Sequence, residues 1–115
     1  MRYVIPLLLL AAPLFAEAPE IEGATAQRSG DVWTVSVTLR HPDTGWDHYA
    51  DGWRVELPEG RVLATRVLLH PHETEQPFTR SQSGIRIPEG TEQVMIRARC
   101  SVDGWAEDTQ VLTLP

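Results

Sequence analysis

The sequence contains no lysine, so all ten of its basic side chains other than histidine are arginines. Sixteen aspartates and glutamates outnumber them, and the formal net charge is -6 at pH 7. Nucleic acids and anionic membrane surfaces are bound by clustered basic side chains, and here the arginines are scattered among acids. We therefore expect a small molecule, a cation or another protein as partner, and no nucleic acid.

Cysteine is almost absent as well, because Cys100 is the single one in the chain. No intramolecular disulfide can form. In an oxidising compartment an odd thiol is buried as a small hydrophobic side chain, paired with another chain or bound to a metal. The cysteine count leaves these three alternatives open.

Long hydrophobic runs are missing except at the beginning of the chain. Residues 1–16 contain one arginine, an apolar run and then small residues, which is typical of a secretory signal and too short for a membrane span. We expect cleavage after Ala16, or after Ala18 as the second choice, and an uncleaved anchor is the alternative. No cysteine lies near this point, so no lipid anchor is expected. Residues 17–115 then form a single domain in the periplasm or outside the cell.

Helical periodicity is also lacking, whereas period-two alternation is frequent. In the clearest run, Trp33, Val35, Val37 and Leu39 lie on one face and polar side chains on the other. Pro58-Glu-Gly60 and Pro88-Glu-Gly90 are typical of tight turns. About seven short strands result, at residues 24–28, 33–40, 53–57, 62–69, 85–87, 93–101 and 110–114. This spacing predicts an all-β, immunoglobulin-like antiparallel β-sandwich, with a small barrel as the alternative.

Three long polar loops, residues 41–52, 70–84 and 102–109, separate these strands. In an up-and-down succession of strands, successive connections lie at opposite ends of the sheet, and every second connection lies at the same end. The three long loops therefore share one end. All four histidines would lie there, with Cys100 at the end of a strand that leads to it. We therefore expect the functional site at this end.

Imidazole nitrogens beside a thiolate and carboxylates suit first-row transition metals such as iron, copper or zinc. The candidate ligands are His41, His48 and Cys100, with His70 and His72 as weaker ones. His70-Pro-His72 has the spacing at which two side chains of an extended backbone point the same way. The alternative for each histidine is a solvated loop residue.

The same residues are similar to a known family. His41-Pro-Asp-Thr, His48-Tyr49 and Cys100-Ser-Val-Asp103-Gly-Trp105 resemble the iron centre of the superoxide reductases, the desulfoferrodoxin and neelaredoxin family. The resemblance covers roughly residues 31 to 114. It implies an immunoglobulin-like sandwich that binds one iron, reduces superoxide and accepts electrons from a donor protein. His41 and His48 match two of the family's four equatorial histidines, and Cys100 matches the axial thiolate.

The chain departs from the family in four places. Asp103 stands where the fourth histidine belongs, residues 17–23 contain no histidine for the N-terminal ligand, and the family's loop lysine is missing. The spacing from His41 to His48 is also one residue longer. The ligand set that the resemblance implies here is therefore His41, His48, Cys100 and Asp103, with a turn-forming role as the alternative for Asp103. A carboxylate ligand at Asp103 would add negative charge, favour the ferric state and weaken superoxide reduction.

Two non-catalytic alternatives remain. The His-Pro-Asp-Thr-Gly stretch is faintly similar to the periplasmic thiosulfate-oxidation carrier subunits, which are protein-binding scaffolds. The loop end could also bind a protein or a ligand through Trp46, Tyr49, Trp53 and Trp105. Against this alternative, Trp33 and Trp53 lie on apolar faces and are expected in the core. Asp43 and Asp51 are interpreted as turn formers.

Overall fold

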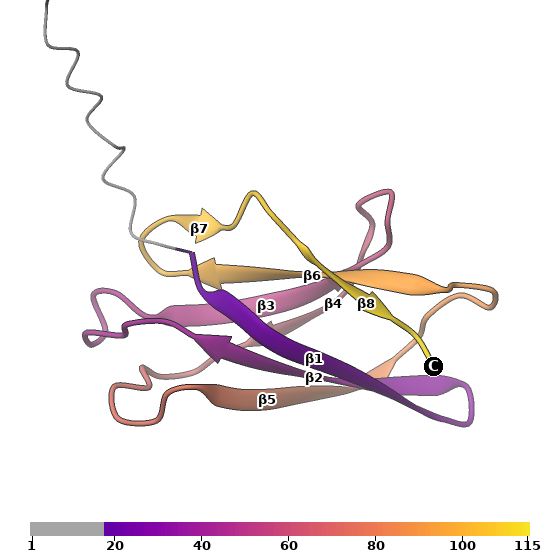
Figure 1. Cartoon of the computed structure of the whole chain (residues 1–115), viewed down its shortest axis with the longest axis horizontal. Coiled ribbons are helices and arrows are strands. Elements are labelled where there is room, and N and C mark those ends of the chain that lie inside the picture. The colour runs from indigo at the N-terminus through magenta and orange to yellow at the C-terminus, as the bar shows by residue number, and fades with distance from the viewer. Residues whose placement is uncertain (1–17) are drawn as a thin grey trace, which may run out of the picture.

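Two antiparallel sheets pack face to face in the computed structural model, which describes residues 18–115 (Figure 1). The predicted signal segment lies outside the described residues. The first sheet has the order β1-β2-β5 and the second β4-β3-β6-β7, with β8 also paired to β6. The strands are β1 (Glu20–Ser29), β2 (Val32–Arg40), β3 (Ala50–Glu56), β4 (Val62–Val67), β5 (Phe78–Ile85), β6 (Gln93–Cys100), β7 (Gly104–Trp105) and β8 (Gln110–Thr113). The predicted all-β sandwich is confirmed.

The core lies between the sheets and is built mainly by the period-two alternation of β2 and β6. Buried positions of these two strands alternate with more exposed ones, so each turns one row of apolar side chains inward. In β3 the pattern is irregular, since Gly52 and Trp53 are both buried. Burying a large apolar side chain contributes about 1.5–3 kcal/mol. Trp53 is among the largest fully buried side chains, and Trp53→Ala would cost about 3–5 kcal/mol. The expectation that Trp33 and Trp53 lie in the core is confirmed.

Two strand predictions were wrong at the edges of the sheets. Strand β1 begins at Glu20 rather than residue 24, and β5 runs through Phe78–Ile85, where a loop was expected. In β5 only the two end residues, Phe78 and Ile85, are buried. Between them Arg80 and Gln82 are half-buried and polar, because this strand lies at the edge of its sheet. Hydroxyl pairs such as Ser36–Ser81, at 2.7 Å between the oxygens, join β5 to β2 on the exposed face. An edge strand of this composition lacks the apolar alternation that marks a half-buried strand.

Tight turns and long loops lie at opposite ends of the sandwich, as the up-and-down succession predicted (Figure 1). At the turn end, Arg28 and Glu89 form an ion pair at 2.7 Å that joins the β1–β2 turn to the β5–β6 turn. At the other end, the amide of Ser101 donates to the carbonyl of Tyr49 at 2.9 Å, which joins the loop after β6 to the loop after β2. Among residues 18–115 no helix is long and apolar enough to cross a membrane.

Candidate metal centre

His41 comes directly after β2, and its side chain continues the inward row of that strand. Burial alternates from Val35 through Leu39 to His41, which is 1% exposed. Its Nδ1 lies 2.6 Å from the Asp43 carboxylate. A carboxylate accepts hydrogen bonds, so the ring proton is on Nδ1 and the lone pair is on Nε2. That Nε2 is buried and has no hydrogen-bond partner among the described residues.

The carboxylate of Asp43 is fully buried and holds three segments together. Its Oδ1 accepts from the His41 ring and, at 3.0 Å, from the amide of Ala50, the first residue of β3. Its Oδ2 accepts at 2.8 Å from the amide of His72 in the loop before β5. Metal-binding histidines are commonly oriented by such a carboxylate on the other ring nitrogen. Asp43 does more than form a turn, which is the role the sequence suggested.

His48 is positioned by a compact turn of the loop after β2. The amide of His48 donates to the carbonyl of Gly45 at 3.2 Å, and the amide of Thr44 donates to the carbonyl of His48 at 3.0 Å. Gly45 has a φ of 129°, which a side chain would strain. The His48 ring meets the His41 ring edge-on, with 4.7 Å between centroids. Its Nε2 is also buried and unpartnered within the described chain.

Cys100 ends β6 on the inward face, in the same row as Val94, Ile96 and Ala98, and it is fully buried. The amide of Asp103 donates to Sγ across 3.3 Å, within sulfur hydrogen-bond range. The turn after β6 therefore holds the sulfur in place with a backbone N–H.

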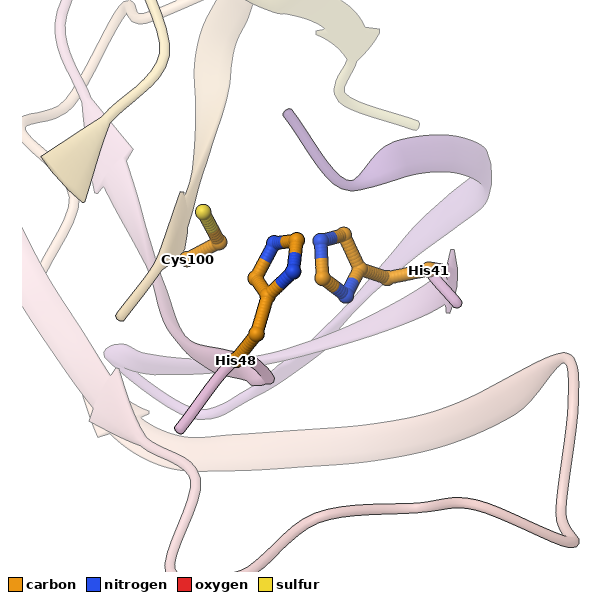
Figure 2. Close-up of side chains that lie close together, drawn as sticks. All are labelled: His41, His48 and Cys100. Atoms are coloured by element: carbon orange, nitrogen blue, oxygen red, sulfur yellow. The ribbon is translucent and has the colours of Figure 1, made fainter. Parts of the chain in front are cut away.

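The three side chains converge from the end of β2, the following loop and the end of β6 (Figure 2). One donor atom of each, from His41, His48 and Cys100, lies within 4.8 Å of the other two. Donors bound at about 2.0–2.3 Å to one ion lie about 3–4.5 Å apart, so little movement is needed to ligate it. Two buried, unpartnered imidazole nitrogens beside a thiol cost free energy unless a partner satisfies them. The residues therefore fit a transition-metal ion.

The other two histidines lie at the same end but outside this cluster. His72 stacks on Phe78 with 3.9 Å between ring centroids, and its Nε2 lies 3.1 Å from a guanidinium nitrogen of Arg80. Burial lowers the pKa of His72, and the charges of Arg80 and His70 lower it further. The neutral ring therefore accepts the Arg80 bond. His70 is exposed, and its Nδ1 lies 3.1 Å from the carbonyl oxygen of Pro71.

Asp103 lies beside the cluster rather than in it. The residue is exposed, and its carboxylate Oδ2 is 4.0 Å from Cys100 Sγ. Its ligand role stays a prediction of the resemblance. Trp46 is 68% exposed at the rim of the loop end, whereas Trp105 packs against two guanidinium groups, of Arg54 at 4.2 Å and Arg99 at 5.5 Å.

Sequence reasoning missed the part that Asp43 plays in this site. The signal was present, because the inward row of β2 extends past the strand to His41 and then Asp43 at the same spacing of two. A histidine and an aspartate two residues apart that both point inward can form the hydrogen bond that the structure shows.

Comparison with known proteins gives few relatives. No family model matches the chain. A protein of Halomicrobium mukohataei named "Putative lipoprotein" is 41% identical over 96 residues, which are 84% of this chain and 47% of that protein. The chain thus spans about half the length of the curated relative it matches. The crystal structure of hypothetical protein PH1083 from Pyrococcus horikoshii OT3 matches 86% of this chain and 88% of its own, with a TM-score of 0.54 and 15% identity. At this identity the likeness shows the fold alone.

Proposed function

We propose that residues 18–115 form an extracytoplasmic domain that binds one transition-metal ion through His41, His48 and Cys100. Two observations carry the proposal together. One donor atom of each of the three side chains lies within 4.8 Å of the other two, and both histidines have a buried Nε2 without a hydrogen-bond partner among the described residues. Asp43 fixes the orientation of the first imidazole, and the Asp103 amide donates to the Cys100 sulfur. The protein thus supplies two nitrogen donors and one sulfur donor in a buried position.

The proposed location outside the cytoplasm rests on two observations. The Halomicrobium relative is named a lipoprotein, which is a class of exported protein. Residues 1–16 of this chain have the composition of a secretory signal. A periplasmic or secreted domain fits both, and a single cysteine that is buried against histidines is compatible with an oxidising compartment.

Reaction with superoxide is the activity that the family resemblance implies, with an electron-donor protein as partner. A bound redox metal with a thiolate ligand would supply one-electron chemistry at the loop end. The chain's own residues would bind and orient that metal and exclude water from it, since His41 and Cys100 are buried. Superoxide reduction is the finer part of the proposal, and it depends on metal binding.

The test is metal content, measured by mass spectrometry on mature protein after anaerobic loading with ferrous, cuprous or zinc ions and removal of excess metal. We expect about one ion per chain in the wild type and loss of that ion in His41→Ala and Cys100→Ala. His70→Ala is the matched control, because it removes an exposed histidine at the same end and should keep the ion. Absence of any bound metal in the wild type would overturn the proposal, as would full retention in His41→Ala.

A further inference from the structure

The number of nitrogen donors does not fit the iron centre that the resemblance implies. That centre needs four imidazoles and one thiolate, and the structure brings only His41 and His48 to Cys100. The chain has four histidines in all, and the remaining two, His70 and His72, have the separate contacts described above. No further histidine or cysteine is present in the sequence to complete the set.

We propose that the ion at this centre is copper, held by Nε2 of His41, Nε2 of His48 and Sγ of Cys100. This rests on the proposed function, since it names the metal of that same site. Two imidazoles and one thiolate form the trigonal donor set that is typical of protein copper sites. Soft thiolate ligands also select cuprous copper, and cupric copper stands highest in the order of divalent first-row affinities.

Structural zinc and the family's iron would each require more donors than the described residues offer. Structural zinc sites are closed by four protein ligands, whereas an open zinc site keeps three, so zinc is the metal against which copper has to be tested. A further candidate is the exposed Asp103 carboxylate, whose Oδ2 lies 4.0 Å from Sγ. Asp103 is not among the residues whose donor atoms all lie within 4.8 Å of one another. Iron in the family's centre has five protein ligands, of which only three have counterparts in this cluster.

The surroundings of the sulfur also match a copper–thiolate bond. Cys100 is fully buried and pairs with Ala50 across the strands, so small apolar groups lie beside it. Its sulfur receives one backbone N–H, from Asp103 at 3.3 Å. Apolar packing and hydrogen bonds at the cysteine sulfur are the features that set the potential of copper–thiolate sites. The Asp43 carboxylate, bonded to the His41 ring, strengthens that imidazole as a donor.

Competition between metals tests this inference. Metal-free mature protein is mixed anaerobically with one equivalent each of cuprous, ferrous and zinc ions, excess metal is removed, and bound metal is measured. We expect copper alone at one ion per chain. Mild oxidation should then give an intense visible absorption band from thiolate-to-copper charge transfer, and Cys100→Ser should abolish it while His70→Ala leaves it unchanged.

The outcomes separate the inference from the proposed function. Stoichiometric iron or zinc that copper does not displace would overturn the copper assignment and leave the metal site standing. Copper that gives no charge-transfer band would show that Cys100 is not its ligand, and copper that is lost in His70→Ala would place it at the exposed histidine. Either result would overturn the inference. No metal of any kind would overturn both proposals. Thermal unfolding of each metal-free variant shows whether a loss of metal reflects a loss of fold.

Discussion

Replacing Asp43 by asparagine changes only the charge and the donor pattern of the buried carboxylate. The carboxylate accepts hydrogen bonds from the His41 ring at 2.6 Å, the Ala50 amide at 3.0 Å and the His72 amide at 2.8 Å. An asparagine side chain has one oxygen and one NH₂ group. With its oxygen toward His41 and Ala50, the NH₂ group must face the amide of His72, so two donors meet.

The magnitude follows from these contacts. One buried amide loses its acceptor, which costs about 1–3 kcal/mol, and the bond to the His41 ring loses its charge assistance. We therefore expect the free energy of unfolding of the metal-free protein to fall by about 2–4 kcal/mol. The His41 ring is then oriented less firmly and is a weaker donor, so metal affinity should fall by about 10–100-fold.

Two measurements check this prediction separately. Denaturant unfolding of the metal-free protein gives the stability change, and chelator competition gives the metal affinity of the folded protein. Asp47→Asn is the control, because it removes an exposed carboxylate from the same loop and should change neither value. If Asp43→Asn binds the metal as tightly as the wild type, Asp43 does not orient His41 for metal binding and the reasoning fails.

Three further predictions concern the scaffold. Glu56 is buried beneath two arginines, and the hydrogen bond from Arg97 lowers its pKa. The stabilisation by ionised Glu56 is therefore complete above the ordinary carboxyl pKa and is lost as pH falls through the lowered pKa. Glu56→Gln should lower the free energy of unfolding by about 1–3 kcal/mol at neutral pH and reduce its dependence on pH in the acid range. Parallel plots of unfolding free energy against pH for wild type and variant would contradict this. Gly52→Ala should lower the free energy of unfolding in denaturant by about 1–3 kcal/mol, because the new Cβ would lie 3.1 Å from a backbone oxygen of β4. Gly23→Ala is the control and should not lower it, because a Cβ there meets nothing within 4 Å. Gly45→Ala should weaken metal binding by distorting the turn that holds the second imidazole, and an unchanged affinity would show that the positive φ is not needed.

The central strands could be predicted from the sequence because burial alone sets their pattern. Trp33 to Leu39 and Val94 to Cys100 alternate strictly, and each alternating side chain lies inside as expected. The same reasoning brought three loops to one end, and the structure finds His41, His48 and Cys100 together there. The tight turns were predicted at the opposite end, and the glycines at their left-handed positions do have positive φ.

The remaining features depend on tertiary contacts that leave little trace in composition. Strand β5 is held by pairing with β2 and by hydroxyl contacts, and its inward positions are polar, so it resembles a loop. The separation of His70 and His72 from the other two histidines depends on stacking against Phe78 and on Arg80. Sequence proximity to the loop end could not distinguish these histidines from the ligands.

One residue of irregular backbone decides which side chain of β3 lies beside the sulfur of Cys100. Between β3 and β6 the register shifts by one, so Gly52 pairs with Arg99 while Ala50 pairs with Cys100. Regular alternation from Trp53 would instead turn Asp51 inward, next to the thiol. Because of the bulge, Asp51 lies on the outer side within 3.3 Å of the Arg99 guanidinium, and the small side chain of Ala50 faces the centre. The bulge thus removes a carboxylate from the cluster and leaves two imidazoles and one thiolate, which is the donor set on which the copper assignment depends.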